Sequence, residues 1–444
     1  MSEAIPLAAN ATAAASLRRR LLFARRSFFV WDTLFCRAPL APLSHFRDWQ
    51  TPRFPDHASR IVYDAIECLR TGGIVPALGN VEQAPLEGTR WPQHPRYLGY
   101  WHDRSAHSVV GMFVGLDIIH SGGRYYVIEC NQGPSIYARR RALYSDRFDP
   151  FIANLLEAAV SLGFEQVVPI ALRWSREYID EWQRAGREYG IAVDPANCPL
   201  WRPEGKRHMV ALPRRLASRT MYVVHSGLNA TPITYVDNKW RMSGWMPGAI
   251  ASELPADTRV ALPMTSERLF IPGGKSEPRW PNLIIKLAGS ARSQHVLAAR
   301  FDDEDEASHA LGLTHAGAVP RPLRPGYLKN LLLYGGDRVL YQEFIPPELD
   351  ERGHARMIRL HLFVAPLATM VLSAHSRISR RPVPERAPHG IVGEDNAFVF
   401  NDADYERLEP EIESELQHDG TELAGLIQRE VERRFETSPE HVSS

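Results

Sequence analysis

Lysine is scarce in this 444-residue chain, which contains only five, at positions 206, 239, 275, 286 and 329. A lysine inside an apolar segment is therefore unusual, and Lys286 is one. The 52 basic and 52 acidic residues give a formal net charge of zero. Without a surplus of positive charge, the sequence offers no electrostatic footprint for nucleic acid or for an anionic membrane, and we expect neither as a partner.

Cysteine and long apolar runs are also lacking. The four cysteines, Cys36, Cys68, Cys130 and Cys198, form no CxxC pair and no His/Cys zinc spacing, so we expect reduced thiols in the cytoplasm. No apolar stretch approaches the length of about 18 residues that a membrane-spanning helix needs. Residues 1–16 have no basic segment followed by an apolar core, which argues against a signal peptide.

The chain is longer than a single hydrophobic core usually accommodates, so we expect about two or three domains. Composition shifts suggest boundaries at 1–150, 151–265 and 266–444. Within the second range, a strand at 166–172, a helix at 176–189 and a strand at 191–194 begin a βαβ unit, which predicts a parallel sheet of its own. No GxGxxG follows the first strand, so a dinucleotide site is not expected.

Hydrophobic periodicity predicts an α/β protein, with α+β lobes. The remaining expected elements are a hairpin at 109–131, helices at 60–70, 150–163 and 303–311, strands near 283–287, 338–344, 357–364 and 369–374, and two polar amphipathic helices between 403 and 436.

The hairpin carries an acidic signature. Asp117 lies in its first strand, and Glu129 and Asn131 end the second strand after an apolar run. These side chains supply the oxygen ligands that Mg²⁺ prefers. A two-residue turn at Gly122–Gly123 would place Asp117 and Glu129 on opposite faces, whereas a three- or five-residue loop would pair them directly. The alternative interpretation is a polar outer face of an edge hairpin.

Lys286 lies near the end of the apolar strand 283–287 and is followed by small residues, among them Gly289 and Ser290. An ammonium group beside a loop of small residues suits a phosphate chain, because the loop amides can approach it closely. The motif is not GxxxxGK[ST]. A strand-end lysine that simply reaches solvent is the alternative.

The strand 338–344 ends in Gln342, Glu343, Phe344 and Ile345, and a proline-stiffened turn leads to Glu348 and Asp350. Such a segment can offer backbone groups to an adenine edge and carboxylates to ribose hydroxyls. An ordinary strand exit would look the same.

Arg359 and His361 share one face of an otherwise apolar strand. An inward arginine is costly unless an anion meets it, so a phosphate group or a carboxylate in a salt bridge is expected beside Arg359. Arg377 and Arg380 are candidates for holding a substrate carboxylate.

The segment with Lys286, the strand 338–344 with its turn, and the strand with Arg359 follow one another along the chain. In this order they resemble the nucleotide-binding half of the ATP-grasp superfamily. Glu129-Cys130-Asn131 resembles the E-x-N metal triplet that closes that family's site, and Asp117 resembles the acid that precedes it. Because the acidic hairpin here comes first, the chain resembles the circularly permuted ATP-grasp group, in patches from about residue 100 onward. The segment 165–260 looks like the small Rossmann-like domain that ordinarily precedes the grasp.

The resemblance implies a carboxylate–amine ligase that uses ATP and Mg²⁺ and forms an amide through an acyl phosphate. It assigns Asp117, Glu129 and Asn131 to the metal and Lys286, Gly289 and Ser290 to the phosphates. It assigns Gln342, Glu343, Phe344, Ile345 and Glu348 to adenosine, and Arg359 and Arg377, with Lys286, to the reacting groups. A phosphotransferase and a non-catalytic nucleotide-binding protein are the alternative functions.

Two points stay open within the resemblance. The family's earlier lysine could be Lys239 or Lys275, and a rival acidic cluster stands at Glu394-Asp395-Asn396. The expected partners are small carboxylate and amine substrates of amino-acid or peptide type. Their identity and the oligomeric state do not follow from the sequence.

Overall fold

The structure is a computed structural model of the chain. It describes residues 108–132, 143–144, 147–170, 176–194, 200–201, 209–210, 217–224, 239–267, 269, 282–288, 296–313, 318–323, 327, 338–365, 368–383, 390–392 and 403–436. The helix expected at 60–70 lies outside these ranges.

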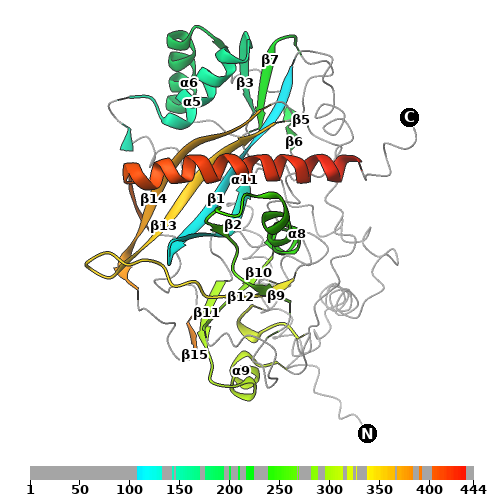
Figure 1. The fold of residues 1–444 in the computed structure, drawn as a ribbon, viewed down its shortest axis with the longest axis vertical. Coiled ribbons are helices and arrows are strands. Elements are labelled where there is room, and N and C mark those ends of the chain that lie inside the picture. The colour runs from blue at the N-terminus through cyan, green and yellow to red at the C-terminus, as the bar shows by residue number, and fades with distance from the viewer. Residues whose placement is uncertain are drawn as a thin grey trace, which may run out of the picture.

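The described residues form a mixed α/β fold around a nine-stranded sheet (Figure 1). The sheet's main path runs β16-β14-β13-β1-β7-β3-β4; β2 branches from β1, and β8 pairs with β2. The strands are β1 (Val109–Ser121), β2 (Arg124–Gln132), β3 (Gln166–Ile170), β4 (Ala192–Val193), β7 (Thr220–Val224), β8 (Val260–Ala261), β13 (His354–Val364), β14 (Thr369–Pro382) and β16 (Ala403–Glu406).

The long strand β1 shares one of its edges between two partners. Its first residues, Val109–Met112, pair in parallel with β7, and residues from Val114 onward pair antiparallel with β2. The parallel set β3-β4-β7 therefore continues into the main sheet. The expectation of a separate parallel sheet was wrong, because β7 pairs with the first residues of β1, which β2 does not cover. All three ranges proposed as domains contribute strands to this one sheet, and their boundaries stay a prediction.

A five-stranded antiparallel sheet, ordered β15-β11-β10-β12-β9, lies beyond β2 in the lower part of Figure 1. Its strands are β9 (Thr265–Ser266), β10 (Asn282–Leu287), β11 (Val296–Arg300), β12 (Val339–Glu343) and β15 (Gly390–Val392). Helix α9 (Glu304–Leu311), capped by Asp303 and ended by Gly312 with positive φ, packs its apolar residues into the core of this sheet. The described residues also include a short strand pair, β5 (Leu200–Trp201) and β6 (Met209–Val210), and a 3₁₀ turn, Arg321–Leu323.

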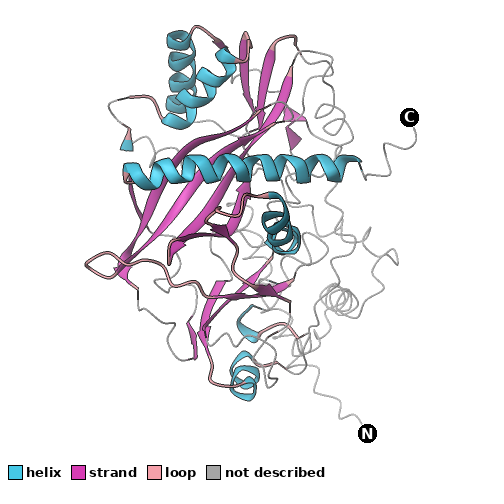
Figure 2. Cartoon of the chain, viewed as in Figure 1, coloured by secondary structure: helices cyan, strands magenta, loops and turns pink. Residues whose placement is uncertain are grey.

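Helices cover the two faces of the large sheet unequally (Figure 2). Helices α8 (Lys239–Glu253) and α11 (Pro410–Glu436) bury apolar side chains against one face along β1 and β13. On the other face, α5 (Pro150–Ser161) and α6 (Arg176–Tyr189) cover the region of Val109, Phe113 and Phe363. Among the described residues, no helix is long and apolar enough to cross a membrane.

The C-terminal region differs from the expected pair of helices. It forms the edge strand β16 and one helix of 27 residues, α11. A β-carbon on Gly420 would lie 2.7 Å from Val371 and 2.9 Å from Leu360, so this glycine is where the helix rests on the sheet rather than where it breaks. Tertiary packing has overridden a local helix-breaking signal.

The other described helices and strands confirm the predicted elements to within a few residues. The helices expected at 150–163, 176–189 and 303–311 and the strands near 166, 191, 283, 338 and 357 are all present. The strand expected at 369–374 continues to Pro382, which brings Arg377 into the main sheet.

Candidate functional site

A row of mostly buried polar side chains lies on the same face of the large sheet as α5 and α6, farther along the strands than the residues those helices cover. Glu129 of β2 pairs with Asp117 of β1, Asp117 pairs with Arg359 of β13, and Arg359 pairs with His375 of β14. Cross-strand partners project from the same face of a sheet. Four strands thus bring these side chains together from positions up to 258 residues apart in the numbering, 117 to 375.

A β-bulge makes the first pairing possible. Gly122 and Gly123, both with positive φ, form a two-residue turn that pairs Ser121 with Arg124. The sequence argument expected such a turn to separate Asp117 from Glu129. However, the register shifts between Asp117 and Ile118, so that Ile118 faces Val127 and Asp117 faces Glu129. One extra residue, Ile128, absorbs the difference, and the assumption of an unbroken ladder was wrong.

Asp117 is buried and held by arginine. Nη2 of Arg359 donates to Oδ2 of Asp117 at 2.6 Å, and Nε of Arg359 donates to Oδ1. Nη1 of Arg377 lies 4.0 Å from the same carboxylate, and Nδ2 of Asn131 donates to Oδ2 at 3.3 Å. Desolvation opposes the charge of Arg359, but Asp117 more than offsets it and raises the pKa of Arg359. The carboxylate of Asp117 is therefore the anion that the inward-facing Arg359 requires, and the two groups form a bidentate pair.

Glu129 is paired with Lys239, the first residue of α8. Nζ of Lys239 lies 3.1 Å from Oε1 of Glu129. Burial opposes ionisation of Glu129, yet the ammonium groups of Lys239 and Lys286 hold its pKa below the usual range. Of the two lysines left open by the sequence, Lys239 thus lies in the site, and Lys275 is outside the described residues.

Lys286 reaches the same place from the other sheet. Its Nζ donates to the carbonyl oxygen of Ile128, the bulge residue, at 3.0 Å and to Oε1 of Gln342 at 2.9 Å. The bulge therefore aligns the two acids and also offers a carbonyl to this lysine. Burial, followed by repulsion from Lys239, lowers the pKa of Lys286 to about 7, although Glu129 and Asp117 act in the opposite direction.

The first turn of α8 also contacts the five-stranded sheet. Glu267, directly after β9, accepts hydrogen bonds from Nε1 of Trp240 and from Nη1 of Arg338, and the Arg338 guanidinium lies 4.1 Å above the Trp240 ring. The backbone N–H of Ala288, where β10 ends, donates to the carbonyl of Arg338 at 2.8 Å. This cluster fixes the helix that presents Lys239 against the strand that presents Lys286.

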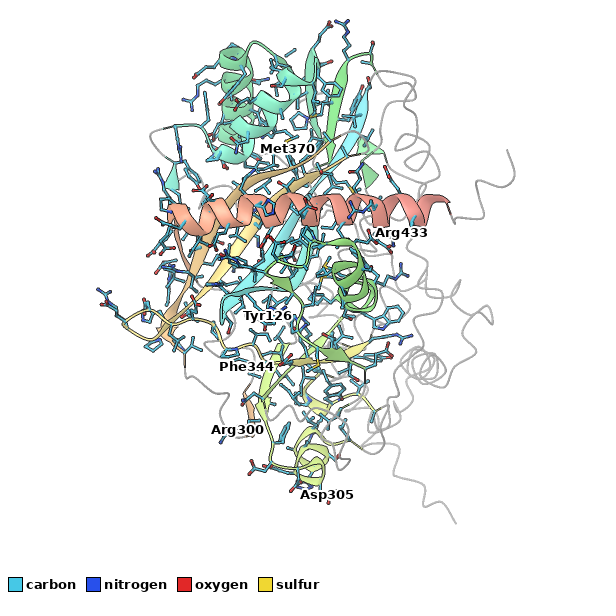
Figure 3. The ribbon with its side chains drawn as sticks, viewed as in Figure 1. Tyr126, Arg300, Asp305, Phe344, Met370 and Arg433 are labelled. Atoms are coloured by element: carbon cyan, nitrogen blue, oxygen red, sulfur yellow. The ribbon has the colours of Figure 1, made fainter. Side chains whose placement is uncertain are left out.

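The predicted adenosine segment leads from one sheet to the other. Gln342 faces Lys286, and its Nε2 donates to Oγ1 of Thr265, whereas the next residue, Glu343, accepts from the backbone N–H of Met264. The backbone N–H of Phe344 donates to Asn282. Figure 3 labels Phe344 at the exit of β12 and Tyr126 on β2, which mark the two sheets where they meet.

The end of that segment lies at the tip of the hairpin. Ile345 is buried, and Oε2 of the exposed Glu348 side chain accepts a hydrogen bond from Nδ1 of His120 at 2.9 Å. Glu348 is therefore placed beside the turn of β1 and β2, while Gln342 is placed beside Lys286.

Two buried histidine rings and the half-buried ring of Tyr405 extend the row behind Arg359. His375 stacks on Tyr405 and lies 5.2 Å from the ring of His361, whose Nδ1 is 3.0 Å from Oγ of Ser373. Arg377 lies over Tyr405. Sequence reasoning noted His361 but missed His375 and Tyr405. The alternation of β14 could have indicated His375, because it is two residues from Arg377.

Other predicted residues lie elsewhere. Arg380 is exposed and donates to Asp404 at 3.1 Å, away from Asp117. Gly289, Ser290 and the rival cluster Glu394-Asp395-Asn396 are outside the described residues.

Comparison with known proteins adds little to this picture. No protein-family model matches the chain, and no curated protein matches it. A solved structure from Methylobacillus flagellatus KT, described as a "Putative gamma-glutamylcysteine synthetase", is similar over 78% of this chain and 94% of that one. The TM-score is 0.36 and the identity is 11%, which is too low to support an argument about this chain.

The side chains present fit a metal–nucleotide complex in their chemistry. Asp117, Glu129 and Asn131 are oxygen donors of the kind that Mg²⁺ takes, and they lie on one face at adjacent positions. Among the described residues, no three His, Cys, Asp or Glu side chains gather as a metal site, so the amide of Asn131 is needed to complete this set. Buried Lys286 and Arg359 provide the positive charge that a polyphosphate requires.

Proposed function

We propose that this protein is an ATP-dependent carboxylate–amine ligase with a circularly permuted ATP-grasp arrangement. One observation supports this most directly: Nζ of Lys286 lies 3.0 Å from the backbone of Ile128, next to Glu129. The lysine expected at the phosphates and the acids expected at the metal thus share one site, although they lie far apart in the sequence. The order of the hairpin first and Lys286 later is the order that the permutation requires.

In this proposal Asp117, Glu129 and Asn131 would hold Mg²⁺, which would supply positive charge for the phosphate groups. Lys286, with Gly289 and Ser290 shortly after it in the sequence, binds the phosphates. The segment from Gln342 through Glu343, Phe344 and Ile345 to Glu348 lines the adenosine side. Arg359 and Arg377 neutralise the transferred phosphoryl group and the substrate carboxylate.

The proposed reaction has two steps. A substrate carboxylate oxygen attacks the γ-phosphorus of ATP, and the bond to ADP breaks. The nitrogen of a substrate amine then attacks the acyl carbon, phosphate leaves, and the amine loses a proton to solvent or to phosphate. The contribution of the protein is to position the groups and neutralise their charge.

The test is an isotope experiment with purified protein, ATP, Mg²⁺ and mixtures of amino acids and small amines. With ¹⁸O-labelled carboxylates, a ligase transfers one label from the carboxylate to the released phosphate. ADP release without free phosphate, together with a stable phosphorylated product, would indicate a phosphotransferase instead. ATP binding without ADP release under all mixtures would indicate a non-catalytic nucleotide-binding protein.

A matched pair of variants assigns any activity to this site. Glu129→Gln removes a carboxylate from the row, and we expect loss of ADP release by roughly a hundredfold or more, as for the removal of a transition-state charge contact. Glu165→Gln makes the same change at an exposed residue that pairs with Arg219, and it should leave the activity unchanged. Near-normal turnover by Glu129→Gln would remove this residue from the mechanism.

A further inference from the structure

We propose that the free protein excludes Mg²⁺ from Asp117 and Glu129, because Arg359 and Lys239 occupy both carboxylates, and that the metal enters only together with a polyphosphate that draws these two cations away. The inference rests on the proposed function for the identity of the polyphosphate. It adds a role for Arg359 and Lys239 as counter-ions that stand in for the metal before the nucleotide binds.

The Asp117 carboxylate has both oxygens engaged. Arg359 donates to Oδ1 and to Oδ2, and Asn131 donates its amide N–H to Oδ2. The Arg359 side chain is 9% exposed and that of Asp117 is 7% exposed, so solvent does little to weaken the pair. A bare divalent ion would have to break a buried bidentate ion pair and leave a guanidinium without its anion, which is strongly unfavourable.

Glu129 is held by Lys239 through one of its carboxylate oxygens. The ammonium group lies 3.1 Å from Oε1, and the side chain of Lys239 is 5% exposed. The position of Lys239 is fixed by its neighbour Trp240, which is tied to Glu267 and Arg338 on the five-stranded sheet. Lys239 is therefore an anchored counter-ion of Glu129 rather than a surface lysine that can swing away at little cost.

The charges of the site favour an anion over a cation. Within the described part of the chain, two carboxylates, Asp117 and Glu129, face four basic side chains, from Lys239, Lys286, Arg359 and Arg377. The ammonium group of Lys286 donates hydrogen bonds to two neutral oxygens, those of Ile128 and Gln342. A bare Mg²⁺ would add two positive charges to this surplus, whereas a triphosphate would compensate it.

An incoming triphosphate can exchange the partners without leaving a charge unpaired. Arg359 and Lys239 gain phosphate oxygens as they release the carboxylates, and the carboxylates gain the metal that the nucleotide carries. Arginine and lysine both bind phosphate oxygens well. Each buried ion thus keeps a partner of opposite sign before and after binding, which is the condition for buried charges to be tolerated.

Binding of Mn²⁺ by the full-length protein, followed by electron paramagnetic resonance of the free ion, tests the inference without reference to turnover. We expect the wild type to bind no Mn²⁺ at this site without nucleotide and to bind it with ATP or a non-hydrolysable analogue. Arg359→Met and Lys239→Met each release a carboxylate, so both should gain affinity for Mn²⁺ alone, by roughly tenfold or more, since a like charge has been removed from the site.

Two controls separate this effect from a general loss of positive charge. Arg356→Met removes an arginine from the same strand, where its partner is Glu409 at 2.6 Å and 2.8 Å, and it should gain no Mn²⁺ affinity. Lys239→Arg keeps the charge beside Glu129 and should also gain none. Circular dichroism confirms that each variant is folded, and the wild-type titration decides the question even if Arg359→Met is not.

The outcomes distinguish this inference from the proposed function. Tight binding of Mn²⁺ to the wild type without nucleotide, at an affinity equal to that of the variants, would overturn the inference while leaving ATP binding intact. Absence of ATP binding by the wild type, measured separately by calorimetry, would overturn the proposed function. In that case a gain of Mn²⁺ affinity in the two variants would still support the role of Arg359 and Lys239 as counter-ions.

Discussion

Lys286 is a basic residue that the fold buries although its ammonium group would be better solvated in water. Its ammonium group is buried between two sheets, and hydrogen bonds to a bulge carbonyl and to Gln342 replace only part of the lost hydration. The lowered pKa of Lys286 expresses this cost. A residue that reduces stability in the free protein but would gain from an anion is typical of a binding site, where strain is offset when the ligand arrives.

The free-energy cost of burying the charged ammonium group of Lys286 predicts that the stability of the protein depends on pH. Because the folded-state pKa of Lys286, about 7, lies below the unfolded value, protonation favours unfolding. The penalty is complete below pH 7 and fades as the pH rises toward about 10.4, the value in an unfolded chain. Lys286→Met should therefore gain more thermal stability, relative to the wild type, at pH 6 than at pH 9.

Calorimetric melting curves of both proteins at the two pH values measure this difference. An equal difference between variant and wild type at pH 6 and pH 9 would show that Lys286 keeps an ordinary pKa. The same variant should bind ATP more weakly, which fluorescence titration of a nucleotide analogue can follow at pH 6, where the wild-type ammonium is charged.

At the scale of elements, two local irregularities determine where side chains meet. The bulge at Ile128 lets a tight turn coexist with the pairing of Asp117 and Glu129. Gly420 lets α11 approach the sheet closely enough to touch Val371 and Leu360. An extra residue in a strand and a glycine in a helix both weaken their own element. Here each one allows a contact with another strand or with the sheet.

The contact at Gly420 predicts a contrast between two glycines of α11. Gly420→Ala should destabilise the protein by roughly 1–3 kcal/mol, because its β-carbon would overlap the side chains of Val371 and Leu360. At Gly425 the nearest atom is the flexible end of Arg429, at 3.3 Å. Gly425→Ala should therefore stabilise the helix by up to about 1 kcal/mol. Urea unfolding of the two variants measures both changes, and equal effects would disprove the close approach.

At the scale of the whole molecule, the site is also the junction of the two sheets. Lys286 joins β10 to β2, Lys239 joins α8 to β2, and Glu267 joins α8 to the five-stranded sheet through Trp240 and Arg338. Among the described residues, the apolar cores of the two sheets form separate clusters, so these polar links are the contacts that join the sheets here. A ligand bound here would therefore stabilise the arrangement of the sheets as well as its own contacts.

This arrangement predicts a joint response to nucleotide. In amide hydrogen exchange, ATP with Mg²⁺ should slow exchange in β2 and in β10 together, since one ligand contacts both strands. Exchange in α6, on the far part of the large sheet, should not change. Protection of only one of the two strands would show that the nucleotide does not bridge the sheets.

The amino-acid sequence by itself determined most of the elements and the chemical types of the site. The alternation around Asp117 and Glu129, the apolar run before Lys286 and the inward position of Arg359 are all properties of short segments. They follow from the periods of strands and helices and from the cost of burying charge. The same local signals failed at the C-terminal helix, where docking on the sheet outweighed the break expected within 403–436.

Only the tertiary structure decided which of these groups meet. Lys239 could not be chosen over Lys275 from the sequence, because its partner, Glu129, lies on a strand more than a hundred residues away. The bulge could not be located, since both registers satisfy the alternation of the hairpin. Pairing across strands depends on long-range packing, and a single sequence records the chemistry of each side chain but not the distance between them.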